Sequence, residues 1–235
     1  MNKISLLEEL AAEIKVCPLC RLSETRTHAV PGEGSPTARI MFVGEGPGEK
    51  EDLSGRPFVG PAGQLLNRLL QQAGIAREEV YIGNTVKCRP PGNRVPLDDE
   101  IAACNDYLMA QIAIIEPKLI VPLGGSALKT LLGPELKITK ARCKVFRKNG
   151  ILFIPLFHPA AALHRAELLE TLQQDILVLR DLINRDIRED EITDLGPRLD
   201  IEETECDKPE PISQSEQAAD VAEPAPAKAQ NLTLF

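Results

Sequence analysis

The chain has 235 residues, of which 43% are hydrophobic, enough for one domain with a substantial core and a tail. Aromatic residues make up only 3%, with no Trp, which argues against a β-sandwich built on stacked rings. The chain has no apolar run of about 18 residues, which a membrane span would need, and the N-terminus lacks the apolar stretch of a secretory signal. We therefore expect a cytoplasmic protein, in which disulfides are rare and the six cysteines need another explanation.

The net charge of −8, taken over the whole chain, argues against a nucleic-acid partner. The distribution of the charge along the chain reverses that inference. Residues 1–185 carry 23 basic and 21 acidic residues, whereas residues 186–235 carry 4 basic and 14 acidic ones. The acidic segment is also rich in Pro, Glu, Ala and Gln, and so offers little apolar surface to offset the entropy of ordering. We therefore predict a folded domain over residues 1–186 and a disordered acidic tail over residues 187–235.

Within the predicted domain, short apolar runs alternate with helical patterns. In chain order, strands are expected over residues 39–44, 80–86, 118–124 and 151–157. Helices are expected over residues 62–73, 97–115, 126–132 and 160–185. Nearly continuous apolar strands that alternate with helices predict an α/β fold around a four-stranded, mostly parallel sheet.

The loops that follow the four predicted strands are rich in glycine and polar residues. They comprise 44–49 with 55–60, 84–91, 124–125 and 158–161. Each loop alone is equally typical of a solvated turn. The carboxyl ends of parallel strands meet at one edge of a sheet, however, so the four loops together favour a binding cleft. The first loop lacks the Gly-Lys-Ser/Thr ending of a P-loop, which argues against nucleotide hydrolysis.

Four of the cysteines form a candidate metal-binding set. Cys17 and Cys20 make a C-x2-C pair, and Cys88 and Cys104 follow singly. Four thiolates can hold structural zinc or an iron–sulfur cluster. One close pair with two distant single cysteines favours a cluster, because zinc sites more often have two close pairs. The alternative is that these cysteines are small buried apolar residues.

Six motifs occur in one order over about residues 1–185: Cys17-x2-Cys20, Gly44-Glu-Gly-Pro-Gly-Glu49, Gly55-Arg-Pro-Phe-Val-Gly-x-Ala-Gly63, Asn84-x-Val-Lys-Cys-Arg-Pro-Pro91, Cys104 and His158-Pro-Ala-Ala161. Together they resemble the iron–sulfur, family 4 uracil-DNA glycosylases. The resemblance implies a three-layer α/β/α fold and a 4Fe-4S cluster held by Cys17, Cys20, Cys88 and Cys104. It also implies excision of uracil from DNA by hydrolysis of the N-glycosidic bond, which leaves an abasic site for base excision repair.

The resemblance assigns roles to residues of the cleft. A uracil that leaves the base stack needs a pocket, and Phe58 offers a ring on which the base can stack. The carboxamide of Asn84 matches the O4 acceptor and N3 donor of uracil, whereas cytosine presents the reverse polarity. His158 is expected to stabilise negative charge on the departing base, as a catalytic residue. Gly46 and Pro47 complete the first loop of the uracil-binding set.

Two glutamates carry further expectations. Glu45 is assigned as a catalytic residue that orients water or the pocket backbone, and it also belongs to the uracil-binding set. Glu51 is expected against C5 of uracil, where it excludes the methyl group of thymine. In family 1 enzymes an Asp follows in the corresponding loop, and Gly46 stands there in this chain. Without the resemblance, Phe58 is equally typical of a core residue, Asn84 of a turn and His158 of a helix cap.

DNA contacts are expected after His158. Leu163 is placed to fill the space that the flipped base vacates, and Arg165 to contact phosphate. Cations on the cluster side (Lys87, Arg89 and Arg94) and the basic stretch 137–148 are further candidates. A run of charge is equally typical of a solvated surface.

The C-terminal peptide 230–235 resembles the short motif by which bacterial repair proteins bind the sliding clamp, through Gln230, Leu232, Leu234 and Phe235. The Gln stands one residue early for that motif, and the alternative is an apolar terminus that arises by chance. A disordered tether would let this peptide reach a partner while the domain, expected to be a monomer, scans DNA.

Two other functions stay open on the sequence. The first is a catalytically inactive iron–sulfur nucleic-acid-binding protein. This function stays open because Gly46 stands where family 1 enzymes have an Asp. The second is a zinc-stabilised nucleotide hydrolase that uses the same cleft. Release of uracil from an oligonucleotide distinguishes the three functions.

Overall fold

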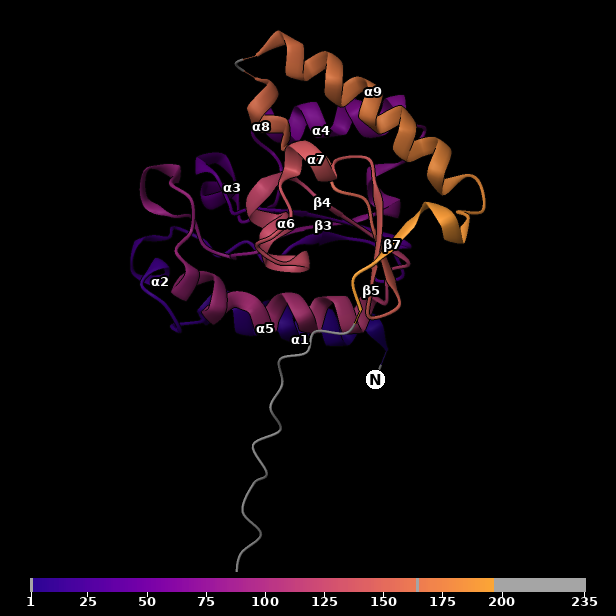
Figure 1. Cartoon of the computed structure of the whole chain (residues 1–235). Coiled ribbons are helices and arrows are strands. Elements are labelled where there is room, and N and C mark those ends of the chain that lie inside the picture. The colour runs from indigo at the N-terminus through magenta and orange to yellow at the C-terminus, as the bar shows by residue number, and fades with distance from the viewer. Residues whose placement is uncertain (1, 164, 197–235) are drawn as a thin grey trace, which may run out of the picture. The chain divides into compact units, whose positions relative to one another are not determined.

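A computed structural model describes residues 2–163 and 165–196 of the chain. It contains a sheet with the strand order β1-β3-β2-β4-β6-β5-β7 (Figure 1). The strands are β1 (Glu33–Gly34), β2 (Ile40–Gly44), β3 (Tyr81–Asn84), β4 (Leu119–Pro122), β5 (Val145–Lys148), β6 (Ile151–Phe153) and β7 (Ile192–Asp194). The α/β fold with a mostly parallel sheet is thus confirmed.

The expectation of four strands was wrong, because the sheet has seven. The four predicted strands are the central ones, β3-β2-β4-β6, and they pair in parallel with one another. The missed strands lie outside them: β1 is antiparallel to β3, β5 is antiparallel to β6, and β7 is parallel to β5. Strand β1 has two residues, and β5 and β7 mix apolar with charged residues. A search for continuous apolar runs finds only strands that are covered on both faces.

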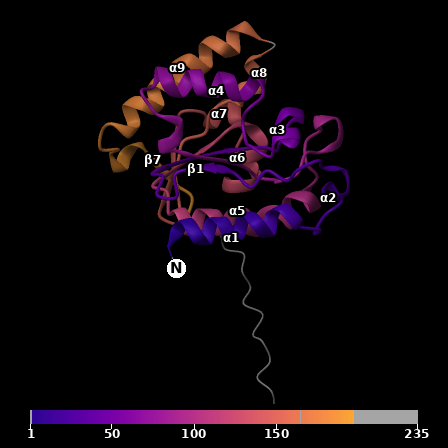
Figure 2. The same cartoon turned by 180° about the vertical axis from the view of Figure 1, so that it is seen from behind.

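Helices cover both faces of the sheet (Figures 1 and 2). One layer contains α4 (Pro61–Gln72), α8 (Pro159–Ala162) and α9 (Ala166–Ile183), and the opposite layer contains α1 (Lys3–Val16) and α5 (Asp98–Ile115). The other helices are α2 (Leu22–Thr25), α3 (Glu49–Ser54), α6 (Gly124–Leu132) and α7 (Ile138–Ala141). Figure 2 shows the same two layers from behind, with α4 and α9 on one side and α1 and α5 on the other.

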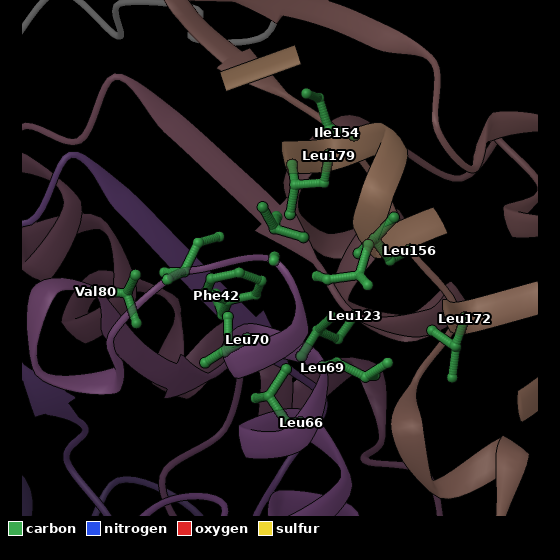
Figure 3. Packing of buried hydrophobic residues seen from close by; sticks show 14 of the residues in the cluster. Phe42, Leu66, Leu69, Leu70, Val80, Leu123, Ile154, Leu156, Leu172 and Leu179 are labelled. Atoms are coloured by element: carbon green, nitrogen blue, oxygen red, sulfur yellow. The ribbon is translucent and has the colours of Figure 1, made fainter. Parts of the chain in front are cut away.

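Successive residues of the central strands supply the two cores. Phe42 of β2 packs with Leu66 and Leu69 of α4 and with Leu179 of α9, as Figure 3 shows. Met41 and Val43, on either side of Phe42, belong to the opposite core, which includes residues of α5 and α6. Side chains alternate between the faces of a strand, so a strand buried on both faces becomes apolar throughout.

The last predicted helix, over residues 160–185, is in fact two helices. His158 caps α8 through its side chain, and Pro159 occupies the first turn. Helix α9 begins at Ala166, after Arg165 with an extended backbone (φ −143°, ψ 104°). Leu163 and Arg165 therefore lie at the corner between two helices.

The folded region also extends past the expected boundary at residue 186. Residues 189–191 form a 3-10 turn, and β7 pairs with β5 through Ile192 and Val145. Ile187 and Ile192 pack against the core, which is why an acidic segment is ordered here. The rest of the predicted tail, with the peptide 230–235, lies outside the described residues. In the part of the chain that is described, no helix has the length and apolar character to cross a membrane.

Candidate functional site

A cavity of about 400 Å³ lies beyond the carboxyl ends of the central strands. It is lined by residues from all four predicted loops. Among them is the complete set expected from the sequence: Glu45, Gly46, Pro47, Glu51, Phe58, Asn84 and His158. The convergence of these loops follows from the parallel strands, whose carboxyl ends share one edge. We refer to this cavity as the base pocket.

Asn84 is the polar residue that most clearly marks the base pocket as a binding site. It ends β3 and is only 1% exposed, yet neither Oδ1 nor Nδ2 has a hydrogen-bond partner among the described residues. Buried polar groups in folded proteins are nearly always paired, because an unpaired one costs about 1–3 kcal/mol. A buried carboxamide with a free donor and a free acceptor therefore indicates a ligand that supplies both partners.

Phe58 forms one wall of the base pocket. Its ring centroid lies 5.7 Å from that of His158, with an angle of 32° between the rings. Its backbone is in the left-handed region (φ 52°), which is unusual for a bulky residue and is found most often at functional sites. Phe58 is 5% exposed and also contacts the core, so it is both a core residue and a wall of the base pocket.

Two glycines make the position of Phe58 sterically accessible. A Cβ on Gly63 would lie 1.9 Å from the carbonyl oxygen of Phe58. A Cβ on Gly44 would lie 2.5 Å from Asn84 Oδ1 and 2.7 Å from the Phe58 ring. Any side chain at either position would therefore displace the residues that form the base pocket.

Glu51 holds the turn that carries Phe58. Its Oε1 accepts hydrogen bonds from the backbone N–H groups of Val59 (2.8 Å) and Gly60 (2.7 Å). The carboxylate lines the base pocket, as expected, but these two bonds fix the loop after Phe58. The structure thus gives Glu51 a supporting contact that the sequence did not suggest.

His158 is positioned as a neutral hydrogen-bond donor. Its Nδ1 accepts a hydrogen bond from the backbone N–H of Ala160 (3.1 Å), which leaves the proton on Nε2. Burial lowers the pKa of His158 to about 4, against the opposing effect of the nearby Glu51 carboxylate. The imidazole is therefore uncharged at neutral pH. The helix cap predicted for His158 from the sequence is confirmed, and the residue lines the base pocket as well.

Glu45 is a half-buried carboxylic acid in the first loop. Burial raises its pKa, and the nearby Ser126 hydroxyl opposes that shift. The neighbouring Gly46 could not carry an acidic side chain without rearrangement, because a Cβ there would lie 2.8 Å from Cγ2 of Val86. Glu45 is thus the acid that this loop presents next to the base pocket.

The four cysteines of the predicted metal-binding set line one small cavity. They come from the end of α1, the loop after β3 and helix α5. Cys17, Cys88 and Cys104 are buried and Cys20 is half-buried. In residues 2–163 and 165–196, no three His, Cys, Asp or Glu side chains are grouped closely enough to hold a single metal ion.

Hydrogen-bond donors point at three of these sulfurs. Nη1 of Arg26 lies 3.1 Å from Cys88 Sγ. The backbone N–H of Leu19 donates to Cys17 Sγ and that of Lys87 donates to Cys104 Sγ, both at 3.5 Å. Donors of this kind stabilise negative charge on sulfur, as thiolate ligands require.

Lys87 and Arg94 differ from the DNA-contacting cations that the sequence suggested. Lys87 is 1% exposed, and burial lowers its pKa to about 8. Arg94 lines the base pocket, but its guanidinium forms two hydrogen bonds with the buried carboxylate of Glu100 (2.8 and 2.6 Å). A lysine in a polar loop looks like a surface residue, and no local pattern marks it as buried.

The expected DNA-contacting residues lie at the corner between α8 and α9. Leu163 is 40% exposed and Arg165 is exposed, beside the segment that contributes His158 and Ala160 to the base pocket. The basic stretch 137–148 is partly used by the fold. Arg142 pairs with Asp175, and Arg147 pairs with Glu189 (2.6 Å).

Comparison with known proteins agrees with this geometry. Residues 31–182 match the model of the uracil DNA glycosylase superfamily. The chain is 48% identical over 185 residues to a type-4 uracil-DNA glycosylase of Sulfurisphaera tokodaii, covering 75% of this chain and 84% of that protein. It is 47% identical to a type-4 uracil-DNA glycosylase of Thermotoga maritima, covering 77% of this chain and 96% of that protein.

A more distant relative is a type-5 uracil-DNA glycosylase of Thermus thermophilus, which is 36% identical over 118 residues, 44% of this chain and 53% of that protein. The type-4 proteins thus match over a longer segment and at higher identity than this type-5 protein. The family expectation drawn from the motifs is confirmed: the chain belongs to the uracil-DNA glycosylase superfamily and, within it, to the type-4 uracil-DNA glycosylases.

Proposed function

We propose that this protein removes uracil from DNA by hydrolysing the N-glycosidic bond, which leaves an abasic site for base excision repair. The observation that carries the proposal is the carboxamide of Asn84, which is buried in the base pocket and whose donor and acceptor have no partner among the described residues. Phe58 and His158 lie on the same pocket. Family membership at 48% and 47% identity to two type-4 enzymes supports the same reaction.

Asn84 reads the base by hydrogen-bond polarity. Its Nδ2 donates to O4 of uracil, and its Oδ1 accepts from N3–H. Cytosine presents a donor at position 4 and an acceptor at N3, so both contacts become repulsive in the buried site. A bidentate pair of this kind discriminates by about 1–3 kcal/mol.

His158 and Phe58 act on the departing base. Bond cleavage places negative charge on uracil O2, and the neutral His158 donates to that oxygen through Nε2–H. Donors that are positioned in advance for developing charge typically contribute a hundredfold or more in rate. Phe58 receives the flipped base on its ring, and its fixed turn keeps that surface parallel to the base. Gly46 and Pro47 border the base on the side of the first loop.

Glu45 is the acid that we assign to orient the attacking water. Replacement by Gln keeps the shape and removes the charge, so Glu45→Gln should reduce the single-turnover rate strongly. A near-normal rate in the presence of excess enzyme would remove Glu45 from the mechanism. Glu51 is assigned a place against C5 of the base, in addition to its contacts with the Phe58 turn.

The decisive test is release of uracil from a labelled oligonucleotide, followed by alkaline cleavage of abasic sites. A shortened strand is expected with uracil and not with cytosine or thymine. Asn84→Ala should lower the rate roughly 10- to 100-fold. DNA binding without strand shortening would favour the catalytically inactive alternative and reject the proposal.

We also propose that Cys17, Cys20, Cys88 and Cys104 hold a 4Fe-4S cluster. The donor set fits, because four cysteine sulfurs line one cavity and N–H donors point at three of them. When bound, the cluster supplies a cross-link between the N-terminal segment, the loop after β3 and helix α5. Purified protein should be brown and contain iron and sulfide, whereas equimolar zinc without iron would overturn the assignment.

For DNA, we propose that Leu163 enters the stack and that Arg165 contacts phosphate. The exposure of both residues at the helix corner supports this. Leu163→Ala should slow excision from duplex DNA more than from single strands, because only a duplex must keep its partner base stacked. An equal effect on both substrates would contradict the wedge.

Binding to the bacterial sliding clamp is a separate proposal, and it rests on the sequence of residues 230–235 alone. Deletion of these six residues should abolish co-elution with the clamp and leave excision unchanged. Unchanged co-elution would reject the contact through Gln230, Leu232, Leu234 and Phe235.

A further inference from the structure

Lys87 is a buried lysine between the base pocket and the cysteine cavity. It is 1% exposed, and its Nζ donates to the backbone carbonyl of Asn84 (2.9 Å) and to Oε1 of Gln111 (2.7 Å). Within the described residues no carboxylate forms an ion pair with it. Lysine is almost never buried without a charged partner, and the group that favours the charged form of Lys87 is the thiolate of Cys104, one of the proposed cluster ligands.

The ammonium of Lys87 is held in place by a rigid neighbour. Gln111 of α5 is also 1% exposed, and its Nε2 donates to the carbonyl of Pro31 (2.7 Å) and to the hydroxyl of Tyr81 (3.0 Å). The amide of Gln111 is therefore used at both ends. Because its oxygen cannot turn away without breaking the other bonds, it fixes the position of the Lys87 ammonium.

The hydrogen bond from Lys87 reaches Asn84 at the end of strand β3. Asn84 is the last residue of β3, and its side chain has no hydrogen bond with the described residues. The placement of the carboxamide therefore depends on the backbone that carries it and on packing beside Gly44. The next peptide is held on its other side by Thr85 N–H, which donates to the carbonyl of Gly44 (2.9 Å).

We propose that Lys87, fixed by Gln111, is a positioning residue for uracil recognition that orients the backbone of Asn84 and, through it, the carboxamide that reads the base. The inference rests on the proposed function. The backbone N–H of Lys87 donates to Cys104 Sγ at 3.5 Å. The same residue therefore links the base-reading strand to the cysteine cavity.

Lys87→Met tests this, because methionine fills similar space without a donor. Single-turnover excision from a uracil duplex should fall about tenfold, and the dissociation constant for free uracil should rise by a similar factor. Lys3→Met is the matched control. It makes the same substitution and removes a lysine bond to a backbone carbonyl, that of Ile115 (3.0 Å), outside the network of Lys87 and Gln111. It should leave uracil affinity unchanged.

A double-mutant cycle separates positioning from general loss of structure. If Lys87 acts through Asn84, adding Lys87→Met to Asn84→Ala should change the excision rate by less than about twofold. A full tenfold loss in that background, or an unchanged uracil affinity in Lys87→Met alone, would overturn the inference. Should Lys87→Met not fold, Gln111→Leu is measured instead, and it should weaken uracil binding in the same direction. Absence of excision by the wild-type protein would instead reject the proposed function itself.

Discussion

Two cavities of the domain lie at opposite ends of the sheet, and they differ in how their polar groups are paired. The base pocket measures about 400 Å³, whereas a groove at the amino ends of the central strands measures about 870 Å³. In the groove, Arg147 pairs with Glu189 and Arg185 with Glu191, both at 2.6 Å. In the base pocket, the side chain of Asn84 has no hydrogen-bond partner among the described residues.

This difference shows that volume alone does not identify the site. The groove is wider, but its Arg147 and Arg185 pair with carboxylates at the surface, where ion pairs contribute little to stability. The base pocket is smaller, but its buried Asn84 side chain has a donor and an acceptor that no described residue pairs, and it holds Phe58 in a strained backbone conformation. Both features are unfavourable for the free protein and become useful only when a ligand binds.

The largest expected effect is on catalysis in the base pocket. His158→Ala should lower the single-turnover rate of uracil excision about a hundredfold or more, because a positioned donor to the departing base is lost. Arg185→Ala, which removes a cation from the groove, is the matched control and should leave the rate unchanged. Equal excision rates for the two variants would contradict the prediction that only the base pocket takes part in catalysis.

A second contrast uses one type of substitution in both cavities. Gly63→Ala should lower the free energy of unfolding by roughly 1–3 kcal/mol and slow excision, because its Cβ would lie 1.9 Å from the Phe58 carbonyl oxygen. Gly74→Ala in the groove meets no atom of the described residues within 4 Å and strains only its backbone (φ +71°), which costs about 1 kcal/mol. Urea unfolding and excision assays measure both, and normal excision by Gly63→Ala would contradict the prediction.

The pH dependence gives a third, smaller effect. His158 has a pKa of about 4 in the folded protein and about 6.5 when unfolded, so the unfolded state binds more protons between these values. Stability should therefore decrease as the pH falls from 6.5 towards 4, and His158→Gln should remove this part of the slope. Thermal melts of both proteins across this range measure it. An inflection of the wild-type excision rate near pH 6.5 due to His158 is not expected.

The smallest effect is expected in the groove. Glu191 has its pKa lowered to about 2, first by the Arg185 guanidinium and then by the backbone N–H of Arg188. Its stabilising contribution is present above pH 4.5 and is lost as the pH falls through about 2. Glu191→Gln should lower Tm by about 1–2 °C at pH 7 without changing excision. The difference in Tm from wild type should narrow in acid, and a constant difference would contradict the ion-pair explanation.

The sequence by itself determined the central architecture and the composition of the base pocket. Apolar runs of nearly unbroken character identified β2, β3, β4 and β6, because only strands buried on both faces lack polar residues. The loops after them had to meet at one edge of the sheet. All seven residues expected in the pocket therefore line one cavity, and all four cysteines line another.

Only the tertiary structure decided which polar groups are paired. Contacts made in the folded chain gave Glu51 its bonds to the Phe58 turn, and they left the Asn84 side chain without a hydrogen-bond partner among the described residues. They also buried Lys87 against Gln111, 24 residues away. The edge strand β7 likewise depends on pairing with β5, because its three residues, Ile192, Thr193 and Asp194, are half-buried or exposed and have no apolar pattern of their own. Burial and hydrogen bonding are properties of three-dimensional neighbours, so local sequence patterns do not encode them.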